Sequence, residues 1–116
     1  MKTVFVAGPF RAAISWEIQQ NVTRAEQVAL ELWRMGLAVL CPHSNCRHFQ
    51  GAAPDDVWLR GDLEMVSRFD AVVMLPTWEF SEGARGEHAH AIKEGKVVFY
   101  WPTDVLKIAK YAEENP

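Results

Sequence analysis

A chain of 116 residues, of which 49% are hydrophobic and 23% charged, is long enough to bury one core, so we expect a single domain over residues 1–116. The formal net charge of −3 argues against a broad basic surface for a nucleic-acid polymer or a membrane. No signal peptide precedes the first apolar run, and no run reaches the roughly 18 residues of a bilayer span. We therefore expect a cytoplasmic protein whose two cysteines are reduced.

Short apolar runs that alternate with amphipathic segments define the expected fold. The runs predict strands at residues 3–7, 37–41, 70–75 and 96–100, and the first two read as buried strands. Helical spacing predicts helices at residues 16–35, 55–69, 81–94 and 103–113, with Ser15 and Ser81 as N-caps. This alternation predicts an α/β fold, a flavodoxin-like doubly wound parallel sheet in strand order 2-1-3-4 with helices on both faces. Residues 43–54 have no period and are expected to form a loop that serves as a lid or binding loop.

The stretch from Ser81 to Glu87 is the expected centre of the functional site. A helix begins there after a strand, so its free N–H groups and positive dipole end favour an anion. Gly83 and Gly86 each weaken the helix by roughly 1 kcal/mol relative to Ala, which suggests that something approaches the backbone closely. Glu87 follows after about one and a half turns and can reach the strand ends. The expected strand order brings the first loop beside it, with Gly8, Pro9, Phe10 and Arg11.

Three further polar residues each allow two interpretations, and two of them, Asp62 and Asn21, lie within the apolar arc of a predicted helix. Asp62 is either a buried Asp satisfied by a cap, a neighbouring Arg or water or, as we favour, a functional partner of Glu87. Asn21 is either a buried side chain bonded to backbone or a ligand contact. His43, just past a strand end, is either a surface histidine of a loop or a ligand contact.

The 81–94 helix is expected to bury an apolar stripe and to place Glu87 at its border, half sheltered from water. The stripe comprises Ala84, Ala89, Ala91 and Ile92. His88 falls within this stripe and is expected to be a core histidine or a support for the site, whereas His90 should point away from it.

A metal site is not expected. Cys41, His43, Cys46 and His48 superficially have the spacing of metal ligands. However, Cys41 belongs to a strand and the chain offers no second Cys/His pair, so the pattern of a closed zinc site is incomplete.

Three motifs, taken together, resemble the nucleoside 2-deoxyribosyltransferase superfamily, which includes deoxynucleoside 5′-monophosphate N-glycosidases and small uncharacterised bacterial relatives. They are residues 6–10, residues 60–66 followed by 70–73, and Ser81-x-Gly83-x-x-x-Glu87 followed by Ala91 and residues 95–97. The resemblance implies that Glu87 is a nucleophile, that Asp62 orients the sugar and the nucleophile, and that the first loop lies near sugar and base. It also implies a phosphate contact for Ser81, since the monophosphate glycosidases carry Ser there whereas many transferases carry an acid.

The resemblance implies cleavage or transfer at the N-glycosidic bond of a deoxynucleoside or its 5′-monophosphate, without a metal or other cofactor. In such a site Glu87 attacks C1′ by the route of a retaining glycosidase, Arg11 helps to hold a phosphate, and Phe10, Trp16 or Trp78 either stacks on the base or belongs to the core or an oligomer contact. The expected partners are a small nucleoside or nucleotide and further copies of this chain, in a homodimer or higher homo-oligomer. The alternatives are a non-catalytic nucleotide-binding or sensing module on the same fold, and an interaction protein with exposed Trp residues.

Overall fold

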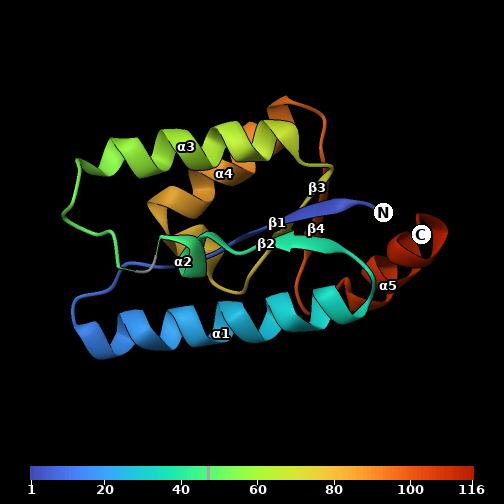
Figure 1. The fold of residues 1–116 in the computed structure, drawn as a ribbon, viewed down its shortest axis with the longest axis horizontal. Helices are drawn as coiled ribbons and strands as arrows, with labels where there is room; N and C mark the ends of the chain where they lie inside the picture. The colour runs from blue at the N-terminus through green and yellow to red at the C-terminus, as the bar shows by residue number, and fades with distance from the viewer. Residues whose placement is uncertain (47) are drawn as a thin grey trace.

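The four apolar runs form one parallel sheet in the computed structural model, which describes residues 1–46 and 48–116 (Figure 1). The strands are β1 (Thr3–Ala7), β2 (Ala38–Leu40), β3 (Ala71–Met74) and β4 (Val97–Tyr100). Their order is β2-β1-β3-β4, and all neighbouring pairs are parallel. The predicted class and strand order are therefore confirmed, with β1 and β3 at the centre of the sheet.

Helices cover both faces of this sheet. They are α1 (Ser15–Arg34), α2 (Pro42–Asn45), α3 (Asp55–Arg68), α4 (Glu82–Lys93) and α5 (Val105–Glu114), with a 3₁₀ turn η1 (Trp78–Phe80) before α4. In Figure 1, α3 and α4 lie above the sheet, whereas α1 and α5 lie below it. In the described part of the chain no helix has the length and apolar character needed to cross a membrane.

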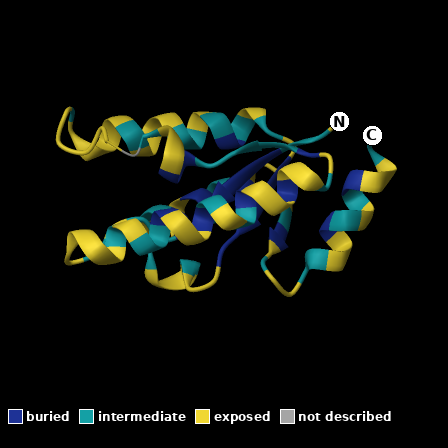
Figure 2. Ribbon diagram, turned by 60° about the horizontal axis from the view of Figure 1, so that its bottom comes forward, coloured by how far each residue is buried: buried dark blue, intermediate teal, exposed yellow. Residues whose placement is uncertain are grey.

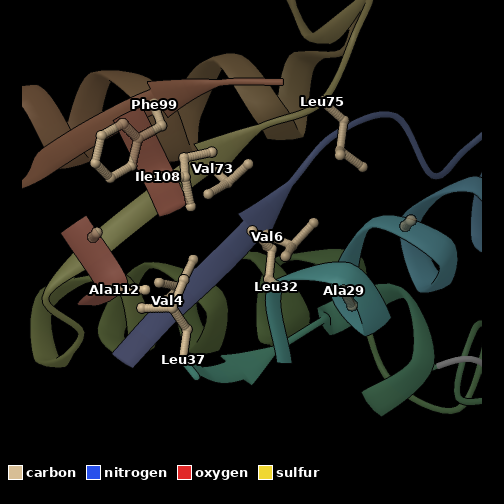
Figure 3. Packing of buried hydrophobic residues seen from close by; sticks show 12 residues of the cluster. Val4, Val6, Ala29, Leu32, Leu37, Val73, Leu75, Phe99, Ile108 and Ala112 are labelled. Atoms are coloured by element: carbon tan, nitrogen blue, oxygen red, sulfur yellow. The ribbon is translucent and has the colours of Figure 1, made fainter. Parts of the chain in front are cut away.

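Alternating side chains of the central strands supply two separate cores. Val4 and Val6 pack with Leu32 of α1 and Ile108 of α5 on one face (Figure 3). The intervening Phe5 and the alternate residues of β3 pack on the other face against α3 and α4. Both faces of the central strands are thus buried, as Figure 2 shows for the dark centre of the sheet, which explains their continuous apolar runs.

The outer strands and two helix starts differ from the sequence-based expectation. All three residues of β2 are only partly buried, because β2 is an edge strand with a neighbour on one side. Ile14, not Ser15, occupies the N-cap of α1, and Ser15 is the first helical residue without a capping hydrogen bond. Pro42 opens the short helix α2 where a loop was expected, consistent with the preference of proline for the first turn of a helix.

Gly8 lets the ends of the two central strands approach each other. The pairing continues past β3, where Leu75 N donates to Ala7 O at 2.8 Å. A Cβ atom on Gly8 would lie 2.7 Å from Cβ of Leu75 and 2.8 Å from its Cδ1, which is closer than two non-bonded carbon atoms can pack. Since the Leu75 Cβ is fixed to the backbone, any side chain at residue 8 must displace the first loop.

We predict that Gly8→Ala lowers the free energy of unfolding by about 1–3 kcal/mol, since overpacking at a fixed backbone costs that much. Urea denaturation of the purified protein measures the change. Gly86→Ala is the matched control: a Cβ atom on Gly86, within α4, would meet no atom within 4 Å, so the same substitution should stabilise the helix by up to about 1 kcal/mol. Equal stability of Gly8→Ala and the wild type would contradict the packing argument.

Candidate active site

A cavity of about 500 Å³ opens at the carboxyl ends of β1 and β3, a volume typical of small-molecule sites. The first loop, the start of α2, one face of α3 and the first turns of α4 enclose it. Its lining comprises Gly8, Pro9, Phe10, Arg11, Pro42, His43, Cys46, Gln50, Asp55, Trp58, Leu59, Asp62, Thr77, Phe80, Ser81, Glu82, Gly83, Ala84 and Glu87. Glu87, Asp62 and most residues proposed for substrate binding are in this lining, whereas Asn21 and two of the candidates for stacking on the base, Trp16 and Trp78, are not.

Glu87 is buried in the wall of the cavity. Its side chain is only 7% exposed, and it lies on the buried stripe of α4 between Ala84 and Ala91. The expectation of a half-sheltered Glu87 at the border of the stripe is therefore wrong. Ala89 and Ile92 are exposed instead, because the helix turns the face of residues 84, 87 and 91 toward the sheet and α3.

Asp62 projects from the middle of α3 into the same cavity and is half buried. Burial raises its pKa to about 6. The pKa of Glu87 is raised well above its ordinary value, first by burial and second by the negative charge of Asp62. No described residue donates a hydrogen bond to either carboxyl group. Two coupled carboxyl groups with raised pKa values hold a proton near neutrality, which is the arrangement required of an acid and a nucleophile that work together.

The start of α4 forms the next part of the wall. Ser81 is the N-cap, as predicted, and its Oγ accepts a hydrogen bond from Ala84 N at 3.2 Å. A Cβ on Gly83 would lie 3.4 Å from Cδ2 of Leu59 on α3, so the two helices come close here. At Gly86 nothing approaches the backbone, and the structure gives no packing reason for a glycine at that position.

The first loop lies across the mouth of the cavity and is held from two sides. Asn21 of α1 donates from Nδ2 to Phe10 O at 3.1 Å, so it contacts the loop backbone and lies outside the cavity lining. Arg11 Nη1 contacts Asp55 Oδ2 of α3 at 2.9 Å, and both side chains are about half exposed. The loop is thus connected to α1 behind it and to α3 across the opening.

His43 is a buried histidine and not a surface residue of a loop. Only 4% of it is exposed, and its Nε2 lies 2.9 Å from Pro9 O. Because a carbonyl oxygen only accepts, Nε2 carries the proton and Nδ1 is left as an acceptor, which has no partner among the described residues. Burial lowers the pKa of His43, so the ring is neutral at physiological pH.

One face of α3 supplies cavity residues that the sequence analysis did not propose. Asp55, Trp58 and Leu59 precede Asp62 at spacings of three and four residues, which places all four on the same side of the helix. The buried Nε1 of Trp58 has no hydrogen-bond partner in the described structure. Their helical spacing could have identified these residues from the sequence. Once Asp62 is assigned to the site, the residues one and two turns before it lie on the same side of the helix.

Trp16, Trp78, His88 and His90, which the sequence analysis also discussed, lie outside the cavity lining. Trp16 is 67% exposed on the first turn of α1. Trp78 stacks on His88 with 4.2 Å between ring centroids, and His88 Nε2 lies 2.8 Å from the Tyr100 hydroxyl, so His88 is a packing residue beside the site. His90 does not point away into water, because its Nε2 contacts Ser67 Oγ of α3 at 2.7 Å.

The two cysteines occupy different environments. Cys41 packs against the core beside α1, whereas Cys46 lines the cavity. Burial and the nearby charge of Asp62 raise the pKa of Cys46, so its thiol stays protonated and is a poor nucleophile. Within residues 1–46 and 48–116, no three His, Cys, Asp or Glu side chains are grouped closely enough to hold a metal ion. His48 is exposed.

The fold and the place of the cavity define an α/β protein with a 2-deoxyribosyltransferase-like fold. A 2-deoxyribosyltransferase from the psychrotolerant bacterium Bacillus psychrosaccharolyticus, described as a biocatalyst for nucleoside synthesis, superposes with a TM-score of 0.61 at 22% identity, covering 84% of this chain and 70% of the other. A 2-deoxyribosyltransferase from Leishmania mexicana superposes with a TM-score of 0.62 at 18% identity, covering 86% of this chain and 63% of the other. This chain thus spans less than two thirds of the Leishmania protein.

The match in sequence is to a different family description than the matches in structure. Residues 2–100 match the model of the family described as domain of unknown function DUF4406, and the chain belongs to this family. No curated protein matches the chain significantly in sequence. The likeness to the two transferases is therefore a likeness of fold.

We predict that Asp62→Asn stabilises the protein at pH 8 by about 1–2 kcal/mol and has no such effect below pH 4. A folded-state pKa near 6 against an ordinary value of 3.8 means that the native state loses stability as the pH rises between those values. A shift of two pK units corresponds to about 3 kcal/mol in the free energy of unfolding. We expect a smaller change because Asp62 is partly solvated.

Urea denaturation at pH 4 and pH 8 measures this difference. Glu64→Gln is the matched control, since Glu64 lies on the same helix, is exposed and pairs with Arg68 at 2.9 Å. Destabilisation by Asp62→Asn at both pH values would contradict the assignment of a raised pKa to Asp62.

Proposed function

We propose that this protein cleaves, or transfers across, the N-glycosidic bond of a deoxynucleoside or deoxynucleoside 5′-monophosphate, with Glu87 as the nucleophile. The observation that carries the proposal is the pair of carboxyl groups of Glu87 and Asp62 in one cavity, both with raised pKa values and neither bonded to a described donor. The transferase-like fold supports the choice of reaction class.

The two coupled carboxyl groups share one proton, and the proposed first step proceeds from the form in which this proton has moved from the buried Glu87 to Asp62, so that Glu87 is ionised. The Glu87 carboxylate attacks C1′ of the deoxyribosyl group while the C1′–N bond breaks and its electron pair moves to the base. The carboxylic acid of Asp62 gives its proton to the departing base. A covalent glycosyl ester on Glu87 remains, together with the free base and an ionised Asp62.

The second step regenerates the protein. Water attacks C1′ of the glycosyl ester and passes a proton to Asp62, and the bond to Glu87 breaks, which gives the free sugar. A second base in place of water gives a new nucleoside. A 2-deoxy sugar suits this route, because without an electron-withdrawing 2′-hydroxyl group its oxocarbenium-like transition state forms more readily. The steps need no metal.

Other cavity residues have proposed roles in holding the substrate. Phe10, which packs edge-on against His43 with 5.8 Å between ring centroids, is available to contact the base. His43 and Trp58 line the same cavity, and their buried Nδ1 and Nε1 atoms have no hydrogen-bond partner among the described residues, so we assign both side chains to the recognition of a polar ligand. Arg11 and the Ser81 hydroxyl are the candidates for a phosphate. The association of the chain with further copies of itself remains a prediction.

We predict that Glu87→Gln abolishes base release, with a loss of at least about 1,000-fold, because an amide cannot form the glycosyl ester. Chromatography of a panel of deoxynucleosides and deoxynucleoside 5′-monophosphates after incubation with each variant measures release. Glu64→Gln controls for the loss of one carboxylate and should retain wild-type release.

The same panel separates the enzyme from the binding-module alternative. Ligand binding by Glu87→Gln together with release by the wild type supports the proposal. Binding without release by the folded wild type contradicts it and favours a nucleotide-binding or sensing module. The thermal shift of each variant with ligand reports binding independently of turnover.

A further inference from the structure

The described lining of the cavity is strongly acidic. It contains four carboxyl groups, those of Asp55, Asp62, Glu82 and Glu87. Among the described lining residues, Arg11 is the one side chain with a full positive charge, since His43 is neutral. An anionic ligand therefore meets more negative than positive charge.

The positive charge of Arg11 is already compensated within the protein. Its Nη1 lies 2.9 Å from Oδ2 of Asp55, and this pair joins the first loop to the first residue of α3. Both residues line the cavity. A phosphate that approaches Arg11 must either displace the Asp55 carboxylate or bind beside it against like-charge repulsion.

The amino-terminal end of α4 is the second feature that favours an anion. An acidic residue of the protein already offsets its positive dipole end. Glu82 is the first residue of this helix, so its carboxylate lies at the positive end of the helix dipole. The N–H group of Ala84 is already bonded to Ser81 Oγ at 3.2 Å. Each of the two potential phosphate contacts thus has an acidic residue of its own.

We propose that Asp55 is a specificity-determining residue that selects against a 5′-phosphate, so that the cavity takes an uncharged deoxynucleoside in preference to its 5′-monophosphate. This inference rests on the proposed function and deepens it. Asp55 acts in two ways: it occupies Arg11, and it adds a negative charge at the mouth of the cavity. Glu82 adds to the same effect at the start of α4.

Isothermal titration calorimetry with a deoxynucleoside and its 5′-monophosphate tests the inference. All variants carry Glu87→Gln as well, so that neither ligand is cleaved. Asp55→Asn should tighten binding of the monophosphate about two- to fivefold, the range of an exposed ion pair, and should leave binding of the deoxynucleoside unchanged. Adding Arg11→Ala should remove this gain.

Asp56→Asn is the matched control. Asp56 is the next residue of α3, loses the same charge and pairs with Arg60 at 3.7 Å on the exposed side, outside the cavity lining. It should leave the ratio of the two affinities unchanged. The preference for the deoxynucleoside should also weaken as salt is raised, because salt screens the repulsion between exposed charges.

Tighter binding of the monophosphate than of the deoxynucleoside without the Asp55 substitution would overturn the inference and leave the proposed function intact. A ratio that Asp55→Asn changes no more than Asp56→Asn would overturn the assigned role of Asp55. Failure of both ligands to bind any variant would overturn the inference and the proposed function together.

Discussion

The parallel pairing of β1 with β3 is the constraint on which the rest of the structure depends. Val4 to Ala7 pair in register with Ala71 to Met74, so the two central strands end at the same level. The chain leaves β1 toward α1 on one face of the sheet and leaves β3 toward α4 on the other. Because the two connections diverge, a cavity opens between them, and the close contact with Leu75 holds Gly8, one of the lining residues, in place.

This arrangement places polar chemistry directly beside the core, at a cost in stability. Glu87 occupies the middle of a helix stripe whose neighbours, Ala84 and Ala91, pack against the sheet. A buried carboxyl group without a described donor destabilises the folded protein as it ionises. The fully buried central strands supply the compensating hydrophobic stabilisation, and a residue that weakens the fold locally is the kind expected at a functional site.

The sequence predicted the fold, and drew attention to two carboxyl groups that line one cavity, because those signals are local. The runs of β1 and β3 are apolar at every position, since both faces of these strands are covered. Asp62 interrupts the apolar arc of its helix, and Glu87 follows the start of a helix that comes directly after a strand. The orientation of α4 was not predictable in this way, because tertiary packing left the apolar Ile92 exposed and buried the charged Glu87. The segments that connect strands to helices at the cavity have no hydrophobic periodicity, so their backbone conformation was not predictable from the sequence either. His43 reaches it from α2, which was expected to be a loop, and Thr77 reaches it with a positive φ of 65°, a strained conformation for a β-branched residue.

For the reaction that we propose, the electrostatics of the cavity favour the transition state over the ground state. A buried carboxylate that lacks described hydrogen-bond donors is poorly stabilised in the presence of a neutral sugar, and it is well stabilised once positive charge develops at C1′ and the ring oxygen. Glu82 acts in the same direction, because a second carboxylate in the lining also attracts a developing cation. For the reaction that we propose, this fixed negative charge stabilises the transition state, and the same charge disfavours an anionic ligand in the ground state.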